Sequence, residues 1–262
     1  MSVYCRRTSD RADFIRRAFA DLAIDRSLVG ISSVLVKPNI VSSEPYPTTT
    51  HPSVLEACLE YLLNRGLKIV VADGPAVDAG TSGAVLDNHP LKQVCDRYNV
   101  PLIDLLGQEM VKRKAVEMEL ELSQAAFQYD FILSLPVLKS HFICSLTGAL
   151  KNQFGFLSAK QRVELHVSKD IHRAIAELNL IVRPHFYVID AIETLTKANE
   201  VRHGGEKAEL GYMLAGRDPV ELDVAGLKIL QTVETRLAGK SPEDIPHLRH
   251  AMELGIGGAG GN

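Results

Sequence analysis

Short runs rich in Val, Ile and Leu alternate along this chain with segments that have the apolar spacing of amphipathic helices. This alternation is the strongest constraint on the fold, because such strands and helices assemble into a mostly parallel sheet covered by helices. The expected strands are Val34–Val36, Ile69–Ala72, Pro101–Leu105, Phe131–Leu135, Phe186–Ile189 and Gly211–Ala215. The expected helices are Asp10–Leu22, Pro52–Asn64, Pro90–Tyr98, Asp170–Leu180, Val220–Leu230 and Pro242–Leu254. We therefore predict an α/β fold with a mostly parallel, twisted sheet flanked by helices.

Two segments depart from this pattern. The stretch AVEMELELS, Ala115–Ser123, alternates apolar and acidic residues, which is typical of a strand with one solvent-exposed face. We expect an additional edge strand or a β-hairpin there. The last residues, 255–262, read GIGGAGGN and have no strand or helix pattern around them, so we predict a flexible glycine-rich tail rather than a phosphate loop. Residues 1–262 are otherwise expected to form a single α/β domain.

Charge and hydropathy restrict the class of protein. The 262 residues carry a formal net charge of −3, which provides no general basic field for nucleic acid or an anionic membrane. No apolar run reaches the roughly 18 residues that a membrane span needs. The first residues, MSVYCRRTSDRADFIRR, lack the apolar centre of a signal peptide. We predict a cytoplasmic protein with no nucleic-acid partner and no membrane association.

The cysteines bear on metal and redox chemistry. Cys5, Cys58, Cys95 and Cys144 are isolated, so the paired spacing of zinc ribbons and ferredoxins is absent. Isolated cysteines in such a chain are mostly small buried hydrophobes. Cys144 and His141 have helical i,i+3 spacing, but two ligands are too few to define a metal site. The cofactor is therefore unknown: a divalent metal is compatible with the sequence, and an iron–sulfur cluster less so.

Polar residues follow most of the expected strands. In an open α/β sheet, ligands bind beyond the carboxyl ends of the strands, so residues placed there converge on one site. The residues that follow the strands are Lys37 and Asn39, Asp73, Lys139 and His141, Asp190, and Asp218. We expect a shared site at this edge of the sheet.

The first strand is followed by KPN and then by PTTTHP at the start of a helix. A lysine there can hold a phosphate or carboxylate as a point charge, and hydroxyls and the helix dipole add to the attraction for an anion. The alternative is a loop capped by a threonine, with the lysine in a surface salt bridge. We assign Lys37, Asn39, Thr49, Thr50 and His51 to substrate binding.

The stretch from Ser134 to Gly155 holds two lysines and a histidine among small and apolar residues. A desolvated lysine has a lowered pKa and can act as a base, and histidine titrates near neutrality. We assign Lys139, His141 and Lys151 to catalysis and Asn152 to substrate binding.

Two aspartates and a glycine pair complete the candidate site. Asp73 and Asp190 follow strands and can bind a divalent metal or substrate hydroxyls, although Asp73 can also simply start a turn. Gly204-Gly205 is typical of a tight turn, which we place against the substrate. Asp218, before a proline, is either an N-cap or a member of the site.

The remaining histidines are expected to be structural. His247 and His250 have i,i+3 spacing near the end of a helix, which predicts a solvated helix face. His166 and His172 lie six residues apart and would not share a helical face.

The order of the motifs resembles a known family. VLVKPNIV, TTTHPSVLEACLEYLLNRG, VVADGPA, SLPVLKSH, TGALKNQFG, VIDAIE and LAGRDPVELD follow one another here as in the family of domain of unknown function 362, over roughly residues 31 to 257. Some members carry a ferredoxin-like domain and are described as iron–sulfur proteins; this sequence has no such domain. A fold-level likeness to the amino-terminal region of lactate racemase accompanies it. The positions that match the family's recurrent residues are Lys37, Asn39, Thr50, His51, Asp73, Lys139, His141, Lys151, Asn152, Asp190, Asp218 and Asp223.

Three functional hypotheses follow. The first is an enzyme that acts on a small anionic metabolite, a carboxylate or phosphate, through Lys, His and Asp side chains at the strand ends. The second is an iron–sulfur or redox-associated module that docks to a ferredoxin-type partner; it requires Cys144 exposed beside His141 with another cysteine nearby. The third is a metabolite-binding protein without catalysis. The oligomeric state is not indicated.

Overall fold

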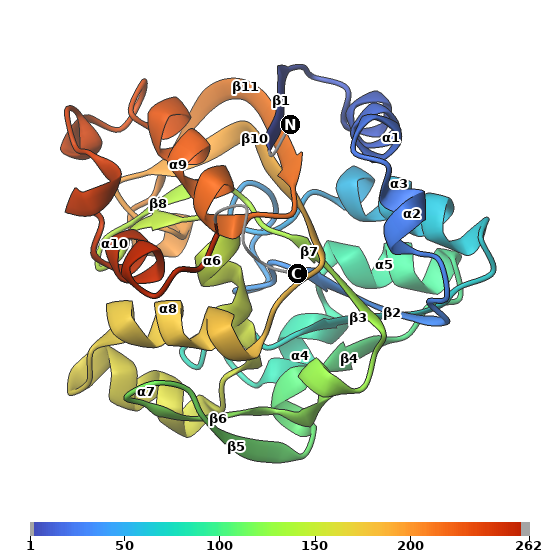
Figure 1. The fold of residues 1–262 in the computed structure, drawn as a ribbon, viewed down its shortest axis with the longest axis horizontal. Coiled ribbons are helices and arrows are strands. Elements are labelled where there is room, and N and C mark those ends of the chain that lie inside the picture. Colours follow the sequence, from blue (N-terminus) through green and yellow to red (C-terminus); the bar gives the residue numbers. More distant parts are fainter. Residues whose placement is uncertain (1–2, 258–262) are drawn as a thin grey trace.

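The computed structural model describes residues 3–257, and within them the main sheet has seven strands in the order β1-β11-β10-β7-β2-β3-β4. The strands from β10 to β4 run parallel, whereas β11 is antiparallel to both of its neighbours. Figure 1 shows helices on both sides of this sheet. The predicted mostly parallel α/β fold is confirmed.

The strands are β1 Val3–Arg7, β2 Ser33–Pro38, β3 Lys68–Asp73, β4 Leu102–Asp104, β5 Met110–Lys114, β6 Glu119–Ser123, β7 Phe131–Leu135, β8 Lys139–His141, β9 Ser145–Thr147, β10 Phe186–Thr196 and β11 Glu206–Gly216. The α-helices are α1 Arg11–Asp21, α2 Ile24–Ser27, α3 Pro52–Leu63, α4 Ser82–Asp87, α5 Pro90–Arg97, α6 Ala149–Asn152, α7 Ala159–Val167, α8 Ile171–Ile181, α9 Pro219–Leu230 and α10 Pro246–Glu253.

The central strand β2 shows how the sheet builds two cores. Its side chains alternate between the two faces, so Val34 and Val36 pack with residues of α1, α3 and α5, while Leu35 packs with residues of α6, α8, α9 and α10. All three side chains are fully buried. A strand that is covered on both faces must be apolar at every position, which explains the continuous apolar run in the sequence.

The direction of β11 changes one expectation. Strands β10 and β11 are joined by residues 197–205, which include Gly204 at φ +87°. A parallel connection needs a crossover of a dozen or more residues, so this short link makes the pair antiparallel. The end of β11 therefore lies at the opposite edge of the sheet. Asp218 does not join the candidate site as expected, and its carboxylate accepts hydrogen bonds from Val220 N and Glu221 N at the start of α9.

The predicted edge strand or hairpin is a hairpin, but with different bounds. Strands β5 and β6 form their own two-stranded sheet, and residues 115–118 are the turn between them rather than part of a strand. The carboxylate of Glu177 on α8 accepts hydrogen bonds from the backbone N–H groups of Val116, Glu117 and Met118 at 2.8–3.1 Å. This buried anion fixes the turn from a distant part of the sequence.

The last predicted helix is divided by a proline. Residues Pro242–Asp244 form a 3₁₀ turn, and α10 begins at Pro246, where a missing N–H costs nothing. The prediction that His247 lies on a solvated face is wrong, because α10 packs on α8 and buries that imidazole completely. His250 is partly exposed and lies 3.1 Å from Glu253. Of the predicted tail, residues 258–262 lie outside the described part of the chain.

Candidate functional site

A cavity of about 240 Å³ lies where β2 and β3 end, and it is closed by the β8–β9 hairpin, α6 and α7. The predicted site residues that line it are Lys37, Asn39, Asp73, Lys139, His141, Lys151 and Asn152. They come from four separate segments of the chain. The expected convergence of strand-end residues is therefore present for these residues.

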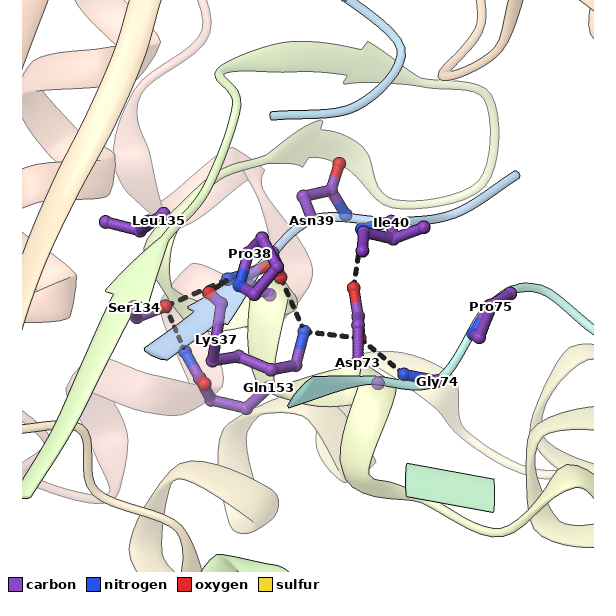
Figure 2. A network of polar contacts seen from close by, with 12 residues as sticks. Lys37, Pro38, Asn39, Ile40, Asp73, Gly74, Pro75, Ser134, Leu135 and Gln153 are labelled. Atoms are coloured by element: carbon purple, nitrogen blue, oxygen red, sulfur yellow. Dashed lines mark hydrogen bonds and ion pairs between the residues drawn. The ribbon is translucent and has the colours of Figure 1, made fainter. Parts of the chain in front are cut away.

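Lys37 and Asp73 face each other across the ends of β2 and β3. The Lys37 Nζ lies 2.6 Å from Asp73 Oδ1, and both side chains are almost completely buried (Figure 2). Asp73 also accepts hydrogen bonds from Ile40 N at 2.5 Å and Gly74 N at 2.7 Å. Burial lowers the pKa of Lys37 and raises the pKa of Asp73, and each partner's charge offsets this effect. Lys37 is therefore part of a buried ion pair rather than an exposed cation that could bind an anion.

Close backbone packing surrounds this ion pair. A Cβ added at Gly155 would lie 2.2 Å from Asp73 Oδ1, so a side chain at that position would collide with the pair. Arg162 on α7 donates to the carbonyl oxygens of Gly74, Pro75, Gly155 and Leu157 at 2.6–2.9 Å. Its guanidinium clamps the loops that follow β3 and α6, and it has little donor capacity left for a ligand.

Lys139 presents a buried amine with one open position. Its Nζ donates to Asn39 Oδ1 at 3.0 Å and to the Thr48 carbonyl oxygen. Burial lowers the pKa of Lys139 to about 7, with the charge of Glu200 partly offsetting that effect and Lys151 adding to it. These two hydrogen bonds use two N–H groups of Lys139 Nζ. The third position on the nitrogen carries a proton when the amine is charged and a lone pair when it is neutral.

Lys151 is the least restrained cation of the cavity. It lies on α6 and is half-buried, and its Nζ has no hydrogen-bond acceptor or carboxylate partner anywhere in residues 3–257. Its Nζ lies 4.5 Å from the centroid of the Phe154 ring. Burial lowers its pKa, as does the neighbouring Arg162. An ammonium in this setting gains most from an anion that enters the cavity.

The hydrogen bonds of His141 define its tautomer. Its Nδ1 lies 3.1 Å from Ile143 N and 3.2 Å from Cys144 N, and both backbone groups are donors. Nδ1 must therefore carry the lone pair, and the neutral ring carries its proton on Nε2. Burial and the charge of Lys151 hold the pKa of His141 well below its usual range. His141 is thus a neutral N–H donor rather than a general base.

The hydroxyls of Thr49 and Thr50 bond to backbone groups of their own loop and of β7. Thr50 Oγ1 donates to the Leu135 carbonyl at 2.7 Å and accepts from Asn39 N, while Thr49 Oγ1 donates to the Glu44 carbonyl. His51 caps α3, with its Nδ1 accepting from Ser53 N at 3.1 Å. These three residues line a separate cavity beside His89 and Lys207. The geometry does not support the predicted role of Thr49, Thr50 and His51 in the same anion site.

The two aspartates assigned to a metal lie in different places. Asp190 is fully buried outside the main cavity, where it accepts from Arg11 Nε at 2.6 Å and from the Tyr46 hydroxyl at 2.8 Å. Asp73 is held by Lys37 as described. Among residues 3–257, no group of three or more His, Cys, Asp or Glu side chains is arranged to hold a metal. The structure therefore does not bring the predicted pair together.

Several cavity residues were not predicted from the sequence. Arg162 and His166 lie at i,i+4 on α7, a spacing that places them on one helix face. Glu200 and His203 come from the loop before β11, in which Gly204 forms the predicted tight turn; Gly204 and Gly205 themselves do not line the cavity. The i,i+4 spacing of Arg162 and His166 was visible in the sequence and could have indicated that both side chains lie on one helix face.

A family model described as "Domain of unknown function (DUF362)" matches residues 34–228. The chain belongs to this family. The match lies within the 31–257 range expected from the motifs and covers the segments that form the cavity. In this DUF362 chain, as far as residues 3–257 show, no helix is long and apolar enough to cross a membrane.

The DUF362 chain is also similar to a protein of known sequence and to two solved structures. A thylakoid-associated protein of Synechocystis sp. is 26% identical over 230 residues, which are 85% of this chain and 68% of the relative. The lactate racemase apoprotein of Thermoanaerobacterium thermosaccharolyticum has a TM-score of 0.56 at 14% identity, over 92% of this chain. A protein of Thermotoga maritima has a TM-score of 0.48 at 13% identity over 84% of this chain. The chain spans 57% of the length of each of these two solved structures, and the racemase likeness shows a shared fold.

Asp223 is expected to control the helix that presents Lys151. The fully buried carboxylate accepts from Ala149 N at 2.6 Å and Leu150 N at 3.0 Å, and thereby caps α6. Asp223→Ala should lower the free energy of unfolding by about 1–2 kcal/mol, the usual value of a lost cap, in urea titrations. Asp170→Ala, which removes an equivalent two-bond cap from α8, is the control.

Both variants should lose stability, but only Asp223→Ala should weaken binding of a small anion, because only that cap holds α6 at the cavity. Equal binding by the two variants would contradict this positioning role.

Proposed function

We propose that this protein is an acid–base enzyme that acts on a small anionic substrate bound in the main cavity. The observation that carries the proposal is the buried Lys139 amine, which has a pKa of about 7 and one open position on a cavity wall. A base whose pKa is close to the operating pH combines a useful neutral fraction with proton-transfer driving force.

The other groups have complementary roles in this proposal. Lys151 holds the anionic group of the substrate by a charge-assisted hydrogen bond. His141 donates its Nε2 proton in a hydrogen bond to an oxygen on which negative charge develops, and it does not change its protonation state. Neutral donors that are already oriented stabilise such charge without reorganisation. The Lys37–Asp73 ion pair holds the ends of β2 and β3 together and thereby shapes the cavity wall.

Binding of simple anions tests the recognition half of the proposal. Acetate, propionate and inorganic phosphate serve as probes in calorimetric titrations of the wild type, Lys151→Met and Lys160→Met. Lys151→Met keeps the length of the side chain but removes the charge, and we expect it to weaken binding about 10- to 100-fold, the range of a charge-assisted hydrogen bond. Lys160→Met, which removes an exposed lysine on α7, should bind as the wild type does. A wild type that binds none of the probes, or equal binding in all three proteins, would refute the proposal.

The redox alternative has no observation in its favour. It required Cys144 to be exposed beside His141 with another cysteine nearby, whereas Cys144 is fully buried. Cys58 and Cys95 pack in the core on the other face of the sheet, and Cys5 is exposed on β1. We therefore base the proposal on the cavity and not on the cysteines.

A further inference from the structure

The mouth of the main cavity has an uncovered apolar surface. Phe142, in the turn between β8 and β9, lines the cavity and is 61% exposed. Val77, in the loop that follows β3, lines the same cavity and is 43% exposed. Single exposed apolar side chains are normal on a protein surface, but two from distant segments that border one cavity indicate a binding surface. This surface suits a ligand with an apolar part.

Phe142 offers one face of its ring to such a ligand. The ring stacks on the imidazole of His141, with 5.5 Å between the centroids and 11° between the planes. His141 is buried and is held in place by the N–H groups of Ile143 and Cys144. The imidazole thus covers one face of the phenyl ring, and the high exposure of Phe142 leaves the other face open. An aromatic side chain that is already oriented stacks on a second ring with little loss of entropy.

The size of the cavity agrees with a ring. Its volume is about 240 Å³, whereas an apolar cavity of roughly 150 Å³ is large enough to bind benzene. The buried side chains of Ile40 and Phe154 continue the apolar wall inside the cavity. Acetate or inorganic phosphate alone would leave most of this space unfilled, while a ring joined to an anionic group would fill it.

Two carboxylates also line the cavity, and both are paired with cations of the protein. The Asp78 carboxylate lies 3.0 Å from Arg202 Nη2 and 3.2 Å from His203 Nε2. The Glu200 carboxylate accepts a hydrogen bond from Arg202 Nε at 2.7 Å. A second charged group on the ligand would have to compete for partners that are already bonded, so the part of the ligand at the mouth is uncharged.

Lys151 determines the anionic group. Lys37 is neutralised by Asp73, and the hydrogen bonds of Arg162 go to carbonyl oxygens. Lys139 is neutral in its proposed active form. Lys151 is thus the lining lysine that can pair with the ligand, and one ammonium matches the single charge of a carboxylate better than the two charges of a phosphate.

We propose that the substrate of this cavity is a small aromatic monocarboxylate, whose carboxylate is bound by Lys151 and whose uncharged ring stacks on the open face of Phe142. This inference rests on the proposed function and narrows it from small anions to one class. Phe142 is then a specificity-determining residue: it distinguishes an acid with a ring from a short aliphatic acid.

Calorimetric titration of the wild type with matched ligands tests the inference. Acetate is compared with phenylacetate, cyclohexylacetate and 2-phenylethylamine, which differ from one another in the ring or in the sign of the charge. Phenylacetate should bind about 10- to 100-fold more tightly than acetate, as expected when one aromatic ring is removed from water. It should also bind about 2- to 10-fold more tightly than cyclohexylacetate, because only the aromatic ring stacks on Phe142. These comparisons need no variant and are therefore independent of any effect on folding.

Variants then locate the ring. Phe142→Ala should lose most of the preference for phenylacetate over acetate. Phe142→Leu keeps an apolar side chain without a ring, so it should lose the preference for phenylacetate over cyclohexylacetate but keep part of the preference over acetate. Phe127→Ala is the matched control, because Phe127 is also an exposed phenylalanine but lines neither of the two cavities. The control should keep both preferences.

The outcomes separate this inference from the proposed function. Binding of acetate and phenylacetate with equal affinity overturns the aromatic class but leaves the anion site intact. Failure of every carboxylate to bind overturns both. Tighter binding of 2-phenylethylamine than of phenylacetate also contradicts both, because the cavity would then select a cation. A folded Phe142→Ala protein that keeps the preference for phenylacetate, or an equal loss in Phe127→Ala, removes Phe142 from this role.

Discussion

Lys139→Met should abolish proton transfer while leaving anion binding nearly unchanged. The variant removes the amine that we propose as the base but retains Lys151 as the anion anchor. Loss of a positioned general base costs about 10²–10⁴-fold in rate. The measurement is uptake of deuterium from D₂O at the carbon next to the carboxylate of bound acetate and propionate, followed by NMR, with binding affinity measured in parallel. Lys112→Met, at an exposed lysine of the β5–β6 hairpin, should exchange as the wild type does.

The pH dependence gives this prediction a second readout. Since the neutral amine is the active form, the exchange rate of the wild type should rise with pH and level off above about pH 7, the pKa of Lys139. The free energy of unfolding should also increase with pH. Lys139 keeps its proton up to about pH 10.4 in the unfolded chain but only up to about pH 7 in the folded chain, so the free energy of unfolding rises between these two pH values. Lys139→Met should show a smaller rise. Exchange within threefold of the wild type in a variant that still binds would exclude Lys139 as the proton carrier.

The sequence predicted those parts of the fold that depend on local pattern. The apolar run of β2 and the spacing of α3 are properties of neighbouring residues, and both elements occur where they were expected. The positions of Lys37 and Asp73 at the carboxyl ends of β2 and β3 likewise followed from strand order, whereas Lys139 begins a separate hairpin strand, β8, that was not expected. The direction of β11 depends on the turn at Gly204, and the bounds of the β5–β6 hairpin depend on the carboxylate of Glu177. The apolar spacing of neighbouring residues gives no information about either effect.

The threonine run shows why the site was only partly predictable. Threonine hydroxyls at the start of a helix can bind an anion or satisfy nearby backbone groups, and the residue types are the same in both cases. In the structure Thr49 donates to the carbonyl of Glu44 in its own loop, and Thr50 donates to the carbonyl of Leu135, 85 residues away on β7. Arg162 likewise donates to the carbonyl of Gly74 from 88 residues away. A contact at that separation leaves no local signal, although helical spacing could have linked Arg162 to His166.

The largest effect on stability is expected from Asp73→Asn. The substitution keeps only one side-chain oxygen, so either Ile40 N, which donates to Oδ2, or Gly74 N, which donates to Oδ1, loses its acceptor. It also leaves the Lys37 ammonium buried at 1% exposure without its anionic partner. Breaking a buried ion pair on one side costs about 3–5 kcal/mol. Urea unfolding should therefore show a loss of this size, measured against the control Asp96→Asn. That control breaks the exposed Lys92–Asp96 pair on α5, which is worth at most about 0.5 kcal/mol.

A double variant distinguishes an uncompensated charge from simple loss of packing. Lys37→Met in the Asp73→Asn background removes the isolated ammonium, so it should recover part of the lost stability because no buried charge remains. If the double variant is less stable than Asp73→Asn by the full cost of Lys37→Met alone, the two side chains contribute independently. In that case the pair cannot be what holds the ends of β2 and β3 together, and the shape of the cavity wall must depend chiefly on the Arg162 clamp.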